Sequence, residues 1–392
     1  MSSKLLDEIE SLRLEMKKTA DFLFNNPELG NEEFQAHQLI CDRLEKEGFI
    51  VAREVSGLKT ALKAVYEVNG GGPKIGLLCE YDALEGLGHA CGHHMQSPSI
   101  MAAAIGLRRV LTQPCTLIVY GTPAEETKSG KLVMAKEGIF DDLDIAFMMH
   151  GSDSTTVDGK SLALNLINFN FHGKSAHAAI APEQGISALD ALLLFFNGME
   201  YLREHVPGEV KMHGIIKEGG KAANIVPDFA STQWYVRAPV RPILDAVLER
   251  VYNVARGAAM QVGATVDIVE EKAYDNKFNA PLLNELLLKH AEAIGTPDIT
   301  PPRVKTGSTD FSSVTYRVPG ACLRVKYVDR GISSHSQAWL DNGKTQMAED
   351  TIMYGAKAIA LTVEDLLEHP EKLQQIKADF AEAKRLAAEG KA

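Results

Sequence analysis

The stretch KIGLLCEYDAL, residues 74–84, joins an apolar run to polar, chemically capable residues, and this pattern decides the fold. Two later stretches repeat it, CTLIVYGTPAEE at residues 115–126 and DIAFMMHG at residues 144–151. Short apolar runs that alternate with helical patterns are typical of a mainly parallel sheet covered by helices, an α/β fold. Active sites of such sheets lie outside the carboxyl ends of the strands, so the polar ends are expected to lie together.

The middle of the chain has a different pattern. From about residue 164 it begins with NFNFH (168–172), which alternates apolar and polar residues, and continues in the order β-α-β-β-α-β. That order is typical of a ferredoxin-like α+β domain. After residue 278 the helix and strand alternation of the first part returns, so we expect a catalytic domain made of residues 1–163 and 279–392, interrupted by an inserted domain at 164–278.

Composition excludes several classes of protein. The net charge of −11 and the pI near 5.6 argue against nucleic acid or an anionic membrane as a partner, because both require a basic face. The first 22 residues alternate charged residues with leucine, unlike a signal peptide, and no apolar run is long enough to span a bilayer. The five cysteines are scattered and odd in number, so we expect no disulfide framework and a reducing, cytoplasmic location.

Two segments could carry metal chemistry. In HACGHH (89–94), Cys91 and His93 are two positions apart, which suits a turn that aims both at one ion, although such a pair alone is more often structural. In GTPAEE, Glu125 and Glu126 point in different directions at a strand end, so one can bind metal while the other takes a proton from water. The alternative for this acidic pair is a solvated helix N-terminus.

Two more histidines end separate segments. His150 closes an apolar run and could be a core histidine, and His335 in GISSHSQAW could be an ordinary loop residue. Taken together, four segments place ligand types at the edge where the site is expected. Five candidate ligands are too many for one tetrahedral zinc and suit two ions that share a bridge. These candidates are Cys91, His93, Glu126, His150 and His335.

Asp82 is a candidate partner of these ligands, because a ligating histidine usually donates its other ring N–H to a carboxylate or a carbonyl. Asp82 lies at a strand end in EYDAL. His89 and His94 flank the candidate ligands, and we expect them to form the wall of the pocket or to support a ligand.

Several segments, in this order, resemble the M20 metallopeptidase family, in its amidohydrolase branch. Within that branch they resemble M20 domain-containing protein 2 and the aminobenzoyl-glutamate hydrolase type. The match covers nearly the whole chain. The segments are EYDALEGLGHACGHH, GTPAEE, MMHG, GKSAHAAIAPEQGISALDAL, GIIKEGGKAANIVPD and GSTDFSSV.

This resemblance implies two metal ions per chain, Zn²⁺ or Mn²⁺, in a dinuclear-metal aminopeptidase-like catalytic domain. It also implies that the inserted domain is a lid through which homodimers often form. Cys91 would bridge the two ions, and His93, Glu126, His150 and His335 would complete the ligand set. Glu125 would be the general base, and Asp82 would orient the site.

The resemblance also assigns residues of the lid. His177 in GKSAHA would reach the substrate carbonyl or its developing oxyanion, commonly from the partner subunit of a dimer. Asn224 in ANIVPD would hold the same oxygen or the substrate carboxylate, and Arg237 in YVRAP would pair with that carboxylate. A bidentate arginine suits a carboxylate, although on the residues alone Asn224 could cap a turn and Arg237 could be an exposed strand residue.

The sequence departs from the family pattern at His94, where relatives often have Asn or Asp, and at residues 127–129, where glycines are common. Neither departure removes a ligand. The predicted function is metal-dependent hydrolysis of the amide bond in small dipeptides or N-acyl amino acids with a free carboxylate. One alternative is a hydrolase with Cys91 as nucleophile, which predicts activity that survives chelation. Another is a metal-containing binding protein, which predicts no effect of Glu125→Gln.

Overall fold

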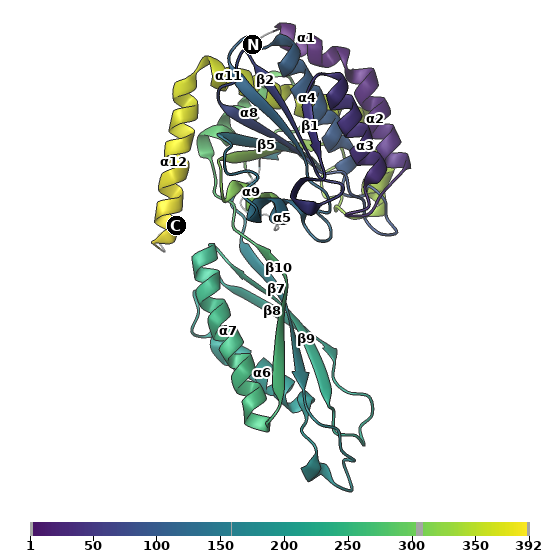
Figure 1. The fold of residues 1–392 in the computed structure, drawn as a ribbon, viewed down its shortest axis with the longest axis vertical. Coiled ribbons are helices and arrows are strands. Elements are labelled where there is room, and N and C mark those ends of the chain that lie inside the picture. The colour runs from purple at the N-terminus through teal and green to yellow at the C-terminus, as the bar shows by residue number, and fades with distance from the viewer. Residues whose placement is uncertain (1–2, 158, 303–308, 390–392) are drawn as a thin grey trace. The chain divides into compact units, whose positions relative to one another are not determined.

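The computed structural model describes residues 3–157, 159–302 and 309–389; residues 307 and 308, the first two of GSTDFSSV, lie outside the described residues. The chain divides into two compact units (Figure 1). The larger comprises Met1–Lys160 and Lys277–Lys384, and the smaller is built on Ser161–Asn276.

The larger unit is built on a seven-stranded sheet with the order β1-β2-β4-β3-β5-β11-β6. The pairs β3/β4, β3/β5 and β5/β11 are parallel, and the outer pairs β1/β2, β2/β4 and β11/β6 are antiparallel. The predicted α/β fold with parallel central strands is therefore confirmed. The strands are β1 (Ile50–Arg53), β2 (Leu62–Val68), β3 (Lys74–Cys79), β4 (Cys115–Gly121), β5 (Ile145–Ser152), β6 (Thr156–Val157) and β11 (Gly320–Lys326).

Helices cover this sheet on both faces. On β3, Leu77 belongs to the main apolar cluster with residues of α1, α4, α8 and α11, whereas Leu78 belongs to a second cluster with residues of α5 and α9. Adjacent strand residues point to opposite faces, so a continuous apolar run fills both cores. The helices are α1 (Ser3–Ser11), α2 (Arg13–Asn25), α3 (Phe34–Lys46), α4 (Gln96–Val110), α5 (Gly130–Lys136), α8 (Pro281–Ala293), α9 (Phe311–Thr315), α10 (Gln337–Asp341), α11 (Gln346–Glu368) and α12 (Pro370–Ala388), with short 3₁₀ turns at Val55–Gly57 and His93–Met95.

The smaller unit has the predicted ferredoxin-like order, with strands β7, β8, β9 and β10 in an antiparallel sheet of order β10-β7-β9-β8. Figure 1 shows α6 and α7 running along this sheet. Phe169 and Trp234 pack against these helices in one apolar cluster, so alternate strand residues form the core. The elements are β7 (Ala163–His172), a 3₁₀ turn at Pro182–Gln184, α6 (Ala188–Arg203), β8 (Lys211–Glu218), β9 (Phe229–Ala238), α7 (Arg241–Val262) and β10 (Thr265–Tyr274).

Among the described residues, the helices are all too short or too polar to cross a bilayer. All five cysteines are buried free thiols.

Candidate metal centre

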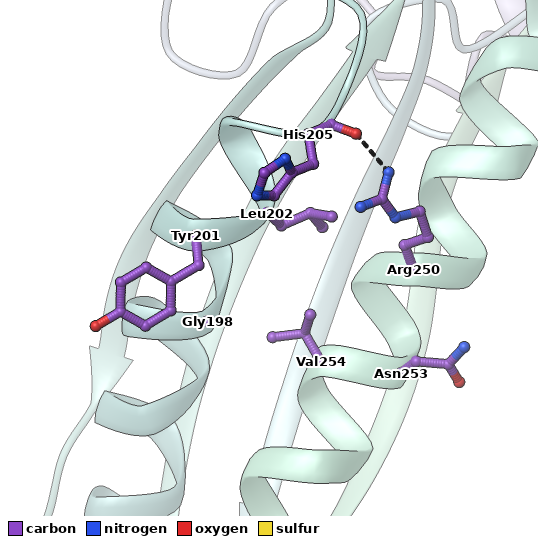
Figure 2. A pocket seen from close by; sticks show the side chains of 7 residues that line it. All are labelled: Gly198, Tyr201, Leu202, His205, Arg250, Asn253 and Val254. Carbon is purple, nitrogen blue, oxygen red and sulfur yellow. Dashed lines mark hydrogen bonds between the residues drawn. The ribbon is translucent and has the colours of Figure 1, made fainter.

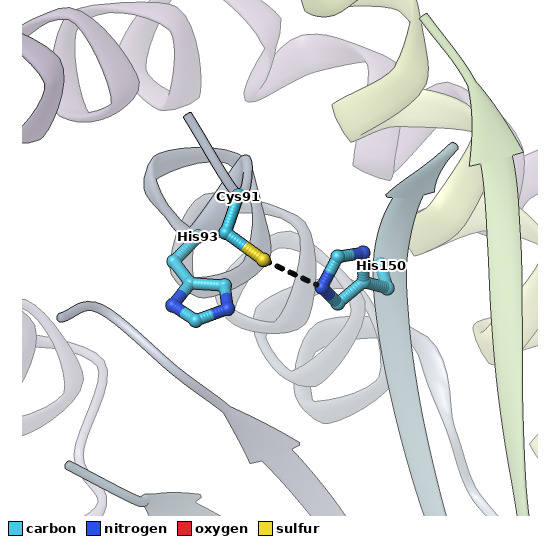
Figure 3. A group of neighbouring side chains, drawn as sticks. All are labelled: Cys91, His93 and His150. Carbon is cyan, nitrogen blue, oxygen red and sulfur yellow. Dashed lines mark hydrogen bonds between the residues drawn. The ribbon is translucent and has the colours of Figure 1, made fainter. Parts of the chain in front are cut away.

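The turn that carries Cys91 and His93 depends on the glycine between them. Gly92 has φ +87°, in the left-handed region that favours glycine, and a Cβ there would lie 3.0 Å from the Met95 side chain. The turn leads through the short 3₁₀ segment into α4. Figure 3 shows that Cys91 and His93 project from this turn on the side where His150 approaches from β5.

Cys91 lies between two histidines from distant segments. Its Sγ is 3.5 Å from Nε2 of His150 and 3.3 Å from Nε2 of His335. His335 has φ +60°, and its backbone N–H donates to the carbonyl of Ala90 at 3.1 Å, which fixes the loop beside the turn. A sulfur between two imidazoles is the arrangement that a bridging thiolate would need.

Asp82 connects a histidine and a glutamate of the cluster. Nδ1 of His93 lies 3.1 Å from Oδ1 of Asp82 and 3.0 Å from its backbone carbonyl. Oδ2 of Asp82 accepts a hydrogen bond of 3.0 Å from the backbone N–H of Glu126. With Nδ1 occupied, His93 presents Nε2 to the cluster, as a ligating histidine supported by a carboxylate does.

The donor atoms of the five candidate ligands form overlapping groups. Ligand atoms of Cys91, His93 and His150 lie within 4.8 Å of one another, and so do those of Cys91, Glu126 and His335. Nε2 of His93 and Oε1 of Glu126 are buried without a well-aligned hydrogen bond, the state expected of atoms that ligate an ion. The shared thiol, the imidazoles and the carboxylate therefore fit two divalent ions.

The protonation states of the candidate ligands differ. Burial lowers the pKa of His150 to about 4, so this imidazole is neutral at pH 7, as ligation requires. Burial opposes ionisation of Glu126, but the hydrogen bond from His335 and the His93 charge lower the pKa of Glu126 to about 2. The same hydrogen bond raises the pKa of His335. Burial raises the pKa of the Cys91 thiol, which is the opposite of what an activated nucleophile needs.

Glu125 lies between this cluster and a second group of acids. One oxygen of Glu125 is within 4.8 Å of ligand atoms of His93 and Glu126, and another grouping joins it to Glu80 and Asp310. Burial, together with the negative charges of Glu80 and Asp310, raises the pKa of Glu125 well above its usual range. A raised pKa suits a group that must accept and then release a proton.

A buried lysine neutralises this acidic group. Lys131 is fully buried, and its Nζ lies 2.5 Å from Glu80 and 2.8 Å from Asp310. Gln96 and Ser129 donate further hydrogen bonds to Glu80 and Asp310 respectively. Oε2 of Glu80 is also 3.2 Å from Nε2 of His93, so the network reaches the candidate ligands directly.

Glu80, Lys131 and Asp310 were not expected from the sequence. Glu80 could have been identified from the sequence, because it stands at the same predicted strand end as Asp82. No sequence feature marks Lys131 as part of the site, since a lysine in the first turn of α5 resembles any exposed helix residue. Only the packing of α5 against α9 brings Lys131 to Asp310.

The other residues singled out in the sequence lie outside the groups of candidate ligands among the described residues. His89 and His94 are buried with their rings 5.4 Å apart, and Nε2 of His94 contacts the carbonyl of Gly343 at 2.8 Å. Neither belongs to a group of candidate ligands among the described residues. His177, Asn224 and Arg237 all lie in the smaller unit.

Hollows are also found away from the cluster, among the described residues. One, of about 470 Å³ in the larger unit, is lined by both Asp153, just after the strand of His150, and Ser334, just before His335. The other, of about 480 Å³, lies between α6 and α7 (Figure 2). There the Arg250 guanidinium donates to the carbonyl of His205, and the other lining residues are Gly198, Tyr201, Leu202, Asn253 and Val254.

Comparison with known proteins identifies the family of this chain. The model of peptidase family M20/M25/M40 matches residues 74–365, most of the chain. The chain belongs to peptidase family M20/M25/M40. It is 33% identical to Xaa-Arg dipeptidase of Mus musculus over 376 residues, which cover 91% of this chain and 87% of the relative. It is 29% identical to one of the subunits of p-aminobenzoyl-glutamate hydrolase of Escherichia coli, covering 94% and 92% of the two chains.

Solved structures of this family share its fold. A dinuclear metal binding peptidase of the M20 family from Bacillus subtilis superposes with a TM-score of 0.70 at 20% identity, covering 92% of this chain and 99% of that chain. The aminobenzoyl-glutamate utilization protein of Klebsiella pneumoniae gives a TM-score of 0.68 at 20% identity, with 91% and 97% covered. As a member of this family, the protein is an enzyme of the metallo-amidohydrolase type.

Proposed function

We propose that this M20 enzyme hydrolyses the amide bond of small dipeptides or N-acyl amino acids that carry a free carboxylate, using two divalent ions, Zn²⁺ or Mn²⁺. One observation carries the proposal: Glu125 and Glu126 follow one another at the cluster, yet only Glu126 is held by Asp82 and His335. Glu125 is a spare, partly buried carboxylate beside the candidate ligands. A site that only stored metal would have no use for it.

The chain's own residues define the steps. Cys91, His93, Glu126, His150 and His335 would hold the ions, which supply an acidified water and polarise the amide carbonyl when bound. Glu125 takes a proton from the attacking water and then passes it to the leaving nitrogen. Asp82 keeps His93 in one tautomer and fixes the backbone of Glu126, so the site changes little during the reaction.

The catalytic parts, residues 1–163 and 279–392, would work with residues 164–278 as a lid. Arg237 pairs with Leu164 at one end of the β7/β9 ladder, whereas His177 pairs with Ile225 beyond its other end. The eight residue-to-residue steps from Phe229 to Arg237 alone span about 26 Å at 3.3 Å per step. A dipeptide is far shorter, so a single lid cannot offer both Arg237 and His177 to one substrate.

A homodimer resolves this separation. Arg237 would read the carboxylate of a substrate, while His177 and Asn224 would stabilise the oxyanion at the site of another copy. Within one lid the backbone joins these two, because the N–H of Ala178 donates to the carbonyl of Asn224 at 3.0 Å. Strand β8 lies at the sheet edge with Ile215 61% exposed, which suits pairing with a second lid.

A hydrolysis screen tests the proposed function. The protein, stripped of metal and refilled with Zn²⁺, Mn²⁺ or Co²⁺, is expected to hydrolyse one of a panel that includes Xaa-Arg dipeptides, aminobenzoyl-glutamate and acetyl amino acids. Turnover that appears only with added ion supports the proposal. Turnover that persists in chelator and stops with a thiol alkylator would instead support Cys91 as a nucleophile.

Mixed dimers test the action of the lid. Subunits with Glu125→Ala and subunits with His177→Ala should each be inactive, while a mixture that exchanges subunits should recover activity. The physical reason is that a hybrid dimer contains one site with an intact Glu125 and an intact partner histidine. Exchange is followed by native mass spectrometry, and no recovery in exchanged mixtures would mean that His177 does not act across the dimer.

A further inference from the structure

The segment PELGNEE, residues 27–33, joins α2 to α3 and runs along the strand ends that carry the site. Leu29 forms a parallel bridge with Ala83, and the N–H of Ala83 donates to the carbonyl of Glu28 at 2.8 Å. Ala83 directly follows Asp82, so this segment is attached to the backbone beside the carboxylate that orients His93.

The same segment also packs against the turn that contains Glu125 and Glu126. A Cβ built on Gly30 would lie 2.9 Å from Cα of Ala124 and 2.3 Å from Oγ1 of Thr127. No side chain fits at Gly30 unless this turn moves. The close approach fixes the position of Ala124, which directly precedes Glu125.

Ala124 has an unfavourable backbone conformation. Its φ is +60°, in the left-handed region, which costs a residue with a Cβ about 1–2 kcal/mol. Its carbonyl accepts from the backbone N–H of Ser129 at 2.6 Å, which closes the turn on one side. On the other side its N–H donates to Oε1 of Glu33 at 2.8 Å.

The two carboxylate oxygens of Glu33 accept different hydrogen bonds, and Oε1 is the one that faces Ala124. The side chain is fully buried, and its second oxygen, Oε2, accepts from Oγ1 of Thr60 at 2.7 Å. Burial raises the pKa of Glu33 to about 7, a sign of how unfavourable this location is for a carboxylate. An acid kept in such a place usually has a specific task.

We propose that Glu33 is a positioning residue of the metal centre, whose side-chain oxygen holds Ala124 in the left-handed conformation that directs Glu125 and Glu126 into the site. This inference rests on the proposed function, in which Glu126 is a ligand and Glu125 the base. Glu33 belongs to none of the groups of candidate ligands among the described residues, and its link to the site is the hydrogen bond from the backbone N–H of Ala124.

The test compares Glu33→Ala with Glu33→Gln, which keeps an acceptor oxygen for Ala124. Zn²⁺ is titrated into metal-free protein by calorimetry, and kcat is measured at saturating Zn²⁺. Glu33→Ala should weaken Zn²⁺ binding by about 10- to 100-fold, the usual effect of removing a group that supports a ligand, and should lower kcat. Glu33→Gln should stay within about threefold of wild type in both.

Glu47→Ala is the matched control, because Glu47 is also buried but is bound by Arg43 and Arg109 at the far end of α3. It should lower the melting temperature without weakening Zn²⁺ binding. If Glu33→Ala does not fold, Glu33→Asp replaces it, since the shorter side chain withdraws from Ala124. Wild-type Zn²⁺ affinity in Glu33→Ala or Glu33→Asp would overturn the inference, whereas a wild type that binds no metal would overturn the proposed function.

Discussion

Replacing Glu125 with glutamine is expected to lower kcat by about 10²- to 10⁴-fold, the usual contribution of a positioned acid–base group. Glutamine has nearly the same shape, but it cannot take a proton from the attacking water. Because Glu126 and Asp82 are untouched, the number of bound metal ions should remain that of the wild type. Steady-state kinetics and metal analysis of the same preparation measure both quantities.

Glu85→Gln is the control for this substitution, since Glu85 is an exposed glutamate that follows the turn of Asp82. It should leave kcat and metal content unchanged. Wild-type kcat in Glu125→Gln, with both ions bound, would remove Glu125 as the base and favour a metal-containing binding protein or another catalytic group.

Replacing Lys131 with methionine is expected to destabilise the protein by about 3–5 kcal/mol, the usual effect of removing one partner from a buried ion pair. Methionine fills a similar volume but leaves the buried carboxylates of Glu80 and Asp310 without their cation. The free energy of unfolding, from urea denaturation of metal-free protein, measures this loss.

Lys136→Met tests the same substitution at the exposed end of α5. It should change the free energy of unfolding by no more than about 0.5 kcal/mol. A Lys131→Met protein as stable as wild type would show that the acids of this network lose their charge at little cost, and that Lys131 is not required to hold them.

The sequence predicted those parts of the fold that depend on local pattern. The apolar runs before Glu80, Gly121 and His150 predicted parallel strands, because each run is long enough to be buried on both faces and ends in polar residues. The β-α-β-β-α-β order of the smaller unit followed in the same way from its alternating strands and helical segments.

Features that depend on contacts between distant segments could not be predicted. The network of Lys131 requires β3, α5 and α9 to meet, and nothing in SGKLVMAK distinguishes Lys131 from the exposed Lys136. The left-handed conformation of Ala124 could not be predicted either, because glycine or asparagine normally marks such a position. The support from Glu33 comes from 91 positions away along the chain.

The family resemblance predicts that His177 and Arg237 both act from the lid, but it does not predict that they lie at opposite ends of one sheet. Their separation follows from register, since His172 pairs with Phe229 at one end of the ladder and Ala163 with Ala238 at the other. Strand register is set by side-chain packing across the whole sheet, so a motif alone cannot reveal it.

The proposed function depends on two metal ions, held by Cys91, His93, Glu126, His150 and His335. The most direct test is the number of Zn²⁺ ions bound per chain when metal-stripped protein is titrated and then analysed by mass spectrometry under native conditions. We expect two ions per wild-type chain and at most one tightly bound ion in Cys91→Ala, because Cys91 is the donor shared by both groups of ligands. No bound ion in the wild type, or two tightly bound ions in Cys91→Ala, would contradict a dinuclear centre bridged by Cys91.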